Sequence, residues 1–245
     1  MVRETNPQTS FLDDAVQPGR GTPSYLADHR ARLRERFEVG GHEPMPDYEL
    51  LELLLFRIVP RRDVKPLARA LVERFGDLGG VLAAAPRDLE AVAGIGPAVA
   101  LELKVTEAVA QRALRAKVMR RPLVSGWEAL LDYLRATMSR APVERFRILF
   151  LDTRNTLIAD EEQARGTVDH VPVYPREVVR RALELGAKAV ILVHNHPSGD
   201  PSPSAGDIDM THRIAEACAV LEITLHDHVI VGREATLSFR AHGHL

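Results

Sequence analysis

The chain of 245 residues is 45% hydrophobic and 27% charged, with a formal net charge of −2. This composition fits one large domain or two ordinary ones, and no stretch approaches the roughly 18 uninterrupted apolar residues of a membrane span. The polar N-terminus lacks the apolar core of a secretory signal, and the single cysteine, Cys218, excludes a disulfide within the chain. We therefore expect a cytoplasmic protein without membrane contact, with Cys218 as an inert core thiol.

The first half of the chain predicts a tail and then a helical domain. Residues 1–24 are rich in polar residues, Gly and Pro and predict a flexible tail. Asp47 is placed to cap one helix, Asp63 precedes another, and Gly76 ends the latter. No strand pattern occurs before residue 118. The expected helices span 48–58, 64–75, 78–85, 88–93 and 97–118.

The connection before the last of these helices resembles a helix-hairpin-helix unit. Gly94 and Gly96 permit positive φ, and Ile95 between them would plug the turn into the core. Backbone N–H groups of such a turn can hold a phosphate, with Lys104 adding charge, so the DNA backbone is one expected partner. A compact connector or a protein-docking surface explains the same residues equally well.

The charge distribution leaves both interpretations open. Residues 25–121 hold 17 Lys and Arg against 14 Asp and Glu, a balance of +3, whereas residues 122–245 hold 13 against 17, a balance of −4. The segment 111–121 has five basic residues and no acidic one. It is either a solvated helix end, where cations are favoured, or a strip that faces phosphates.

The pattern changes near residue 122 and predicts a second domain over 122–245. Ser125 and Glu128 are spaced as a capping box, and strands then alternate with helices. The fold class is therefore α+β or α/β with two domains, the first helical over 25–118. The expected strands span 146–152, 156–160, 165–168, 189–193, 224–231 and 235–239, and the expected helices span 175–185 and 205–221.

A group of potential metal ligands follows the strand at 189–193. His194 and His196 leave one face of the chain because strand side chains alternate, and a Gly/Pro turn then leads to a helix whose first turn contains Asp207. Two imidazoles and one carboxylate suit Zn²⁺ and leave a fourth position for water, which is typical of a catalytic site. The alternative is that Ser204 and Asp207 form an ordinary N-capping pair without metal.

Two further H-x-H pairs need no metal. His226 and His228 flank Asp227 in a strand pattern, and we expect a supporting or core role for one of them, with Asp227 able to orient a liganding imidazole. His242 and His244 lie in a polar tail and are expected to be solvated.

A hydrolytic site also needs a base that accepts a proton from water. Glu144 stands just before the strand at 146–152, and Glu161 and Glu162 stand on an expected hairpin. Composition does not choose among the three.

The run HNHPSGDPSPSAGD at 194–207 matches the JAMM (MPN+) metalloprotease motif. Residues 165–169, 173–177 and 227–232 are similar to the bacterial RadC family, and this resemblance covers roughly residues 25–240. It implies an MPN fold, a mixed sheet flanked by helices, with one Zn²⁺ per chain bound by His194, His196 and Asp207.

The same resemblance implies roles for further residues. Ser204 would help to stabilise an oxyanion, and the JAMM glutamate corresponds by position to Glu144, with Glu161 and Glu162 as rivals. The implied reaction is hydrolysis of peptide or isopeptide bonds in a protein or peptide substrate.

Three functions compete at this point. The first is a zinc hydrolase of JAMM type, a peptidase or isopeptidase associated with DNA. The second is a DNA-binding or DNA-repair protein whose zinc site is structural or regulatory. Cleavage of nucleic acid by the metal is the third, and the lack of further carboxylate ligands counts against it because many nucleases use two metals.

Overall fold

The computed structural model describes residues 24–123, 126–165 and 173–245. Contacts divide the chain into two compact units, residues 1–103 and 104–245. The expected domain limits at 118 and 122 stay a prediction, and the expected tail lies outside the described residues except for Ser24, the first residue of a helix. No helix of the described ranges is long and apolar enough to cross a membrane, and the cytoplasmic location stays a prediction.

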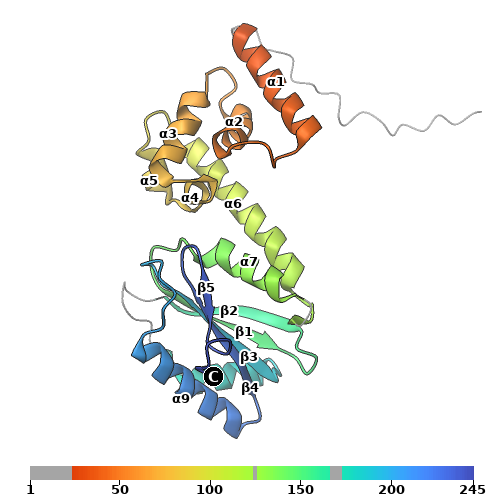
Figure 1. Ribbon diagram of the computed structural model, residues 1–245, viewed down its shortest axis with the longest axis vertical. Helices are drawn as coiled ribbons and strands as arrows, with labels where there is room; N and C mark the ends of the chain where they lie inside the picture. The colour runs from red at the N-terminus through yellow and green to blue at the C-terminus, as the bar shows by residue number, and fades with distance from the viewer. Residues whose placement is uncertain (1–23, 124–125, 166–172) are drawn as a thin grey trace, which may run out of the picture. The chain divides into compact units, whose positions relative to one another are not determined.

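The first unit is built from helices around one apolar core (Figure 1). Leu51 and Leu55 lie four residues apart on one side of α2 and are fully buried, as helical periodicity requires. Described residues 24–103 contain no strand, which confirms the helical prediction. The helices are α1 (Ser24–Gly40), α2 (Asp47–Ile58), α3 (Lys65–Phe75), α4 (Leu78–Ala83), α5 (Pro86–Glu90) and the start of α6 (Pro97–Val118).

One expected helix cap is wrong. Asp47 is the first residue of α2 rather than its cap, and its carboxylate accepts a hydrogen bond from Leu78 N at 2.7 Å, which ties α2 to the start of α4. Asp63 does accept a hydrogen bond from Lys65 N at 3.0 Å just before α3. Gly76 ends α3 with a φ of 93°, a left-handed conformation that favours glycine.

The second unit contains a mixed five-stranded sheet. Its order is β2-β1-β3-β4-β5, in which β3 and β4 are parallel and the other neighbours are antiparallel. A helical region followed by a mixed sheet with helices confirms the predicted fold class. The strands are β1 (Arg145–Leu151), β2 (Leu157–Arg165), β3 (Ala189–Asn195), β4 (Thr224–Val231) and β5 (Thr236–Ser238), and the helices are α7 (Trp127–Met138), α8 (Pro175–Glu184) and α9 (Ala205–Val220).

Helices cover both faces of this sheet, with α7 and α9 on opposite sides (Figure 1). Successive residues of β3 enter different cores because strand side chains alternate. Ile191 packs in the core that contains Leu130 of α7, whereas Leu192 packs in the core that contains Val178 of α8 and Ile214 of α9. Strand β3 is therefore buried on both faces, as its continuous apolar run predicts.

Strand β2 replaces two strands that were expected separately. It runs without interruption over Leu157–Arg165, so the hairpin expected around Glu161 and Glu162 is wrong, and residues 166–168 lie outside the described ranges. The whole of β2 pairs with β1, and two irregularities in the register absorb the extra residues. The polar residues around Glu161 and Glu162 favour a turn locally, but pairing with β1 stabilises them as part of a strand.

Candidate metal centre

Two histidines lie at the carboxyl end of β3. His194 is the sixth residue of this strand and is fully buried, and His196 follows the strand's last residue. Their Nε2 atoms lie 2.9 Å apart, as the alternation of strand side chains predicts. The His194 ring is stacked beside Phe146 with an interplanar angle of 11°, so packing restricts its orientation.

The turn after β3 is tied to the end of β4. His196 N donates a hydrogen bond to Val231 O at 3.1 Å, and Arg233 N donates to Gly199 O at 2.9 Å. At Gly232 the two segments approach so closely that an added Cβ would lie 2.4 Å from Gly199 O. Because Gly232 has no side chain, the turn after β3 can pack against the end of β4, and this packing positions His196.

Helix α9 brings the third potential ligand to the same place. Ser204 and Asp207 form the expected capping box, in which Asp207 Oδ2 accepts hydrogen bonds from Ser204 N at 2.8 Å and Ser204 Oγ at 2.6 Å. The other carboxylate oxygen, Oδ1, lies 3.2 Å from His194 Nε2. Capping and metal binding are therefore compatible, because they use different oxygens of Asp207.

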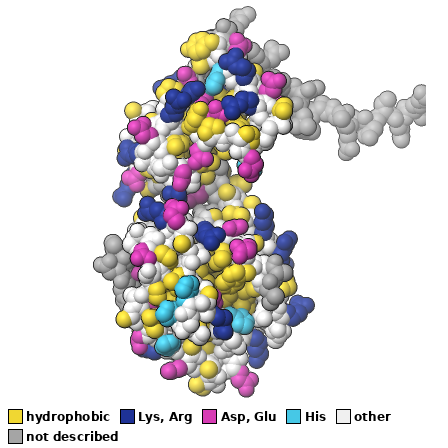
Figure 2. Space-filling model, in the orientation of Figure 1, with side chains coloured by type: hydrophobic (Ala, Val, Ile, Leu, Met, Phe, Trp, Pro, Cys, Tyr) yellow, Lys and Arg dark blue, Asp and Glu magenta, His cyan; other side chains and the backbone are white. Residues whose placement is uncertain are grey.

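The three side chains converge on one point. His196 Nε2 lies 3.6 Å from Asp207 Oδ2, so each histidine faces one oxygen of this carboxylate. Ligand atoms around tetrahedral zinc, with bonds of about 2.0–2.1 Å, lie about 3.3 Å apart. Within the described ranges, His194, His196 and Asp207 are the one group of such side chains that could hold a metal ion. Figure 2 shows histidines gathered on the visible face of this unit.

A chain of hydrogen bonds determines which ring nitrogen of neutral His194 carries the proton. Thr211 Oγ1 donates to Asp207 O at 2.5 Å, so its oxygen accepts from His228 Nδ1, which lies 2.6 Å away. Burial lowers the pKa of His228 well below its ordinary value, which keeps this ring neutral. Its Nε2 therefore accepts from His194 Nδ1 at 2.7 Å, and His194 Nε2 keeps a lone pair directed at the cluster.

The same reasoning applies to His196. Its Nδ1 lies 2.8 Å from Asp200 O, and because a carbonyl only accepts, Nδ1 carries the proton. The lone pair of His196 Nε2 is then also directed at the cluster. Burial opposes ionisation of Asp207, but when the site holds no cation, protonated Nε2 atoms of the two histidines can donate to Asp207, and these hydrogen bonds hold the pKa of its carboxyl far below the ordinary value. A bound cation would take the place of those protons. Two lone pairs and a carboxylate facing one point form a cation site.

The supporting residue is His228 and not Asp227. The Asp227 carboxylate accepts hydrogen bonds from Ser238 Oγ at 2.5 Å and from Arg240 N at 3.0 Å, so it stabilises the chain after β5 and does not touch the cluster. Asp227 pairs with Ile191 and therefore faces the α7 side of the sheet. The expectation that one histidine of this pair has a supporting role is fulfilled by His228.

Glu144 lies directly before β1, close enough to His196 for its charge to act on that ring. It is half-buried, and its charge contributes to raising the pKa of His196, for which the hydrogen bond with Asp207 is the main cause. Buried Asn195 holds both neighbours of Glu144: its Oδ1 accepts from Arg145 N at 2.9 Å, and its Nδ2 donates to Val143 O at 3.2 Å. The residue between the two histidines thus positions the backbone around this carboxylate.

The rival glutamates lie elsewhere on the sheet. Glu161 forms a two-pronged ion pair with Arg181 of α8, at 2.8 and 2.6 Å, and this hydrogen bonding lowers the pKa of its carboxyl. Glu162 is exposed on β2, which is separated from β3 by β1. Of the three candidates, Glu144 is therefore the one that the structure brings to the cluster.

Of the predicted DNA-contact residues, Gly94, Ile95 and Gly96 lie in the first unit, and Lys104 is the first residue of the second. Ile95 is buried in the core, as expected, and Gly94 has a φ of 92°. The positive φ of this turn is therefore at Gly94 and not at Gly96, where a Cβ would meet nothing within 4 Å. Lys104 forms an ion pair with Glu107 of α6. Acidic and basic side chains are interspersed on this unit's visible face in Figure 2, and DNA contact by these residues stays a prediction.

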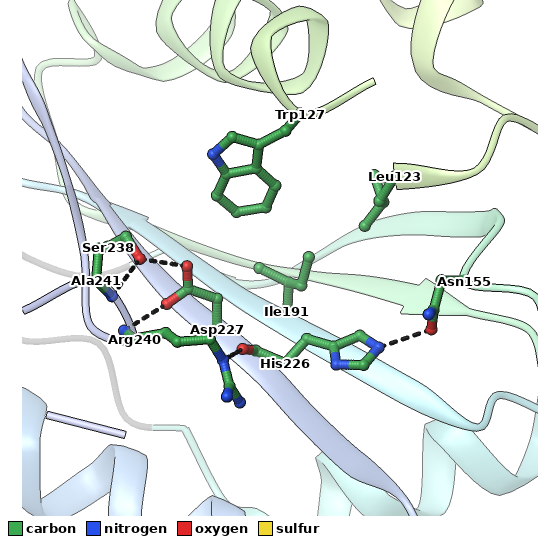
Figure 3. Close-up of a pocket in the computed structure, with 9 residues that line it drawn as sticks. All are labelled: Leu123, Trp127, Asn155, Ile191, His226, Asp227, Ser238, Arg240 and Ala241. Carbon is green, nitrogen blue, oxygen red and sulfur yellow. Dashed lines mark hydrogen bonds between the residues drawn. The ribbon is translucent and has the colours of Figure 1, made fainter. Parts of the chain in front are cut away.

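A separate cavity of about 480 Å³ lies on the α7 side of the sheet (Figure 3). Ile191 lies at its base, the Asp227–Ser238 hydrogen bond lies at one side, and His226 Nε2 lies 2.7 Å from Asn155 Oδ1 at the other. No residue of the metal cluster lines it. The cavity and the cluster thus occupy opposite faces of the sheet.

Comparison with known proteins defines the class of this domain. Residues 124–244 match the model of the RadC-like JAB domain. The chain is 62% identical over 223 residues to a UPF0758 protein of Ruegeria pomeroyi. This alignment covers 91% of this chain and all of that protein. It is 64% identical over 211 residues to a UPF0758 protein of Rhodobacter capsulatus, which covers 86% of this chain and 99% of that protein.

The chain belongs to the UPF0758 family and carries a RadC-like JAB domain over residues 124–244. The resemblance to RadC proteins is thereby confirmed. The names of these relatives state neither a substrate nor a reaction.

Proposed function

We propose that the protein is a zinc-dependent hydrolase of JAMM type that cleaves peptide or isopeptide bonds. The observation that carries this proposal is the convergence of His194 Nε2, His196 Nε2 and Asp207 Oδ1, with both imidazole lone pairs directed at one point. Two imidazoles and a carboxylate favour zinc among common divalent ions, and three protein ligands leave a position open. A zinc ion bound there would polarise a scissile carbonyl and make a water easier to deprotonate.

Glu144 is the base in this proposal. Its carboxylate lies beside the cluster and is half-buried, so it accepts a proton from the attacking water and passes it to the leaving amine. Asn195 maintains this arrangement through its two backbone hydrogen bonds. Glu161 is unsuited to the role because Arg181 holds its carboxylate.

Ser204 supplies an oxyanion donor in this proposal. Its hydroxyl donates to Asp207 Oδ2 at 2.6 Å and accepts from Asp207 N at 3.2 Å. A rotation about the Cβ–Oγ bond would redirect the hydroxyl proton from the carboxylate to a substrate oxygen, where a hydrogen-bond donor stabilises a tetrahedral intermediate.

The first test is the zinc content of the purified full chain, compared with His194→Ala and Asp207→Ala. We expect about one zinc per chain in the wild type and loss from both variants. A folded wild type that takes up no zinc when it is offered would leave Ser204 and Asp207 as a helix cap only.

The second test concerns the reaction. A peptide mixture incubated with the zinc-loaded protein is analysed by mass spectrometry for new termini, with Glu144→Gln, Glu161→Gln and Glu162→Gln in parallel. We expect Glu144→Gln to retain zinc and lose roughly 10²–10⁴-fold in rate, and the other two variants to stay close to the wild type. Full activity of Glu144→Gln would transfer the role of base to another group.

A further inference from the structure

A second cavity in the unit of residues 104–245 has four arginines among the nine residues that line it. It has a volume of about 330 Å³ and lies between α6, α7 and the strands β1 and β2. Four arginines and one carboxylate line it: Arg112, Arg115, Arg145, Arg147 and Asp160. The C-terminal half of α6 contributes two of these arginines, and it packs on this unit through buried Val118.

A satisfied hydrogen-bond network occupies one wall of the cavity. Arg147 donates to both oxygens of Asp160, at 2.9 and 2.8 Å, and Tyr133 Oη donates to Asp160 Oδ2 at 2.5 Å. Burial, followed by the Asp160 charge, raises the pKa of Tyr133 to about 12, so this hydroxyl stays protonated. The Asp160 side chain is fully buried, and its charge is neutralised within the network.

The other three arginines have no such partner. Arg112, Arg115 and Arg145 form no ion pair with any carboxylate of the described ranges, and Arg145 Nε is buried without a hydrogen-bond partner there. Arg115 lies close enough to Tyr133 to affect its pKa. Three guanidinium groups that line one cavity repel one another, and an anion between them relieves that repulsion and satisfies the buried N–H.

We propose that this cavity binds a phosphoryl group. The planar, multiply donating guanidinium matches the oxygens of phosphate, and three uncompensated positive charges suit a terminal phosphate of charge close to −2, or neighbouring phosphodiesters of charge −1 each, better than a single carboxylate. The proposal does not depend on the metal cluster. It assigns phosphate binding to Arg112 and Arg115 of the basic segment 111–121. The phosphate could belong to a small phosphate compound or to a nucleic-acid backbone.

The test is calorimetric titration of the full chain at low ionic strength with three probes: pyrophosphate, a short single-stranded oligodeoxynucleotide and a Glu-rich peptide without phosphate. The variants are Arg145→Gln and the double variant Arg112→Gln/Arg115→Gln, whose positions on an exposed helix surface spare the core. Arg213→Gln is the control, because Arg213 is exposed on α9 and its loss changes the net charge equally per site.

We expect binding of at least one phosphate probe, weakened roughly 10-fold or more by each pocket variant and little by the control. If the pocket variants weaken oligonucleotide binding by this factor, a nucleic-acid backbone is the source of the phosphate. If they weaken only pyrophosphate binding, the source is a small phosphate compound. The proposal fails if no phosphate probe binds, if the double variant binds like the control, or if the Glu-rich peptide binds as tightly as the phosphate probes.

Discussion

His194 Nδ1 lies 2.7 Å from His228 Nε2, and both rings are fully buried. The hydrogen-bonded chain continues from His228 to Thr211 and ends on the backbone carbonyl of Asp207. It therefore connects His194 to Asp207, two of the three proposed metal ligands. A neutral imidazole takes the place of the carboxylate or carbonyl that commonly orients a liganding histidine.

His228→Ala should weaken zinc binding. Without His228 Nε2 the His194 ring loses the acceptor that fixes its tautomer, and supporting residues of this kind typically contribute 10–100-fold in metal affinity. Competition with a chromophoric chelator measures the effect. His226→Ala is the matched control, because His226 lies on the same strand but contacts Asn155. Equal zinc affinities for both variants would show that the His194–His228 contact is dispensable.

Gly232→Ala should disturb the turn that places His196. The new Cβ would meet Gly199 O at 2.4 Å and Pro201 Cδ at 2.9 Å, so the backbone must move, at about 1–3 kcal/mol. We expect a lower thermal midpoint and weaker zinc binding. Gly96→Ala, which has open space around the new methyl group, should change neither property. A Gly232→Ala protein with normal zinc affinity would separate this turn from the metal centre.

Asn195→Ala should separate zinc binding from catalysis. The change removes the partners of Arg145 N and Val143 O, at about 1–3 kcal/mol for each unsatisfied group, and frees the backbone on both sides of Glu144. We expect zinc content close to that of the wild type and a reduced kcat on a peptide that the wild type cleaves. Asn195→Asp, which keeps the acceptor for Arg145 N, should be affected less. Unchanged kcat in a folded Asn195→Ala protein would contradict this positioning role.

Cys218 should make stability fall at high pH. Burial raises the pKa of its thiol to about 11 in the folded state, whereas an unfolded thiol ionises near pH 8.5. The unfolded state therefore releases its proton first, and as pH rises from about 9 to 11 this residue lowers the free energy of unfolding by about 1.4 kcal/mol per pH unit. Urea denaturation of the wild type and Cys218→Ala across this range measures the difference. Parallel pH profiles for the two proteins would refute the shifted pKa.

Gly96→Val tests whether the hairpin contacts DNA. Because a Cβ at Gly96 meets no atom within 4 Å, the fold should survive, yet the side chain would cover the N-terminus of α6, where a phosphate is expected to bind. We expect several-fold weaker duplex binding at low salt, measured by fluorescence anisotropy, if the hairpin is a DNA contact. Unchanged binding by the folded variant would favour the connector or protein-docking interpretation.

Local sequence patterns accounted for most elements of the fold. The range 97–118 agrees with α6 at both ends and 224–231 agrees with β4, because the apolar residues of these ranges include the buried positions of each element. The strands expected at 156–160 and 165–168 failed because β2 is stabilised by pairing with β1, which its polar residues do not indicate. Asp47 failed as a cap because its partner, Leu78 N, lies 31 residues away.

The sequence by itself determined the candidate metal ligands, since His194, His196 and Asp207 lie within 14 residues on a strand, a turn and a helix start whose geometry is local. Only the tertiary structure decided what surrounds them. Parallel pairing of β3 with β4 placed His228 against His194, and antiparallel pairing of β3 with β1 placed Glu144 beside His196. These relationships depend on strand register between distant segments, and a single sequence does not encode register in any local pattern.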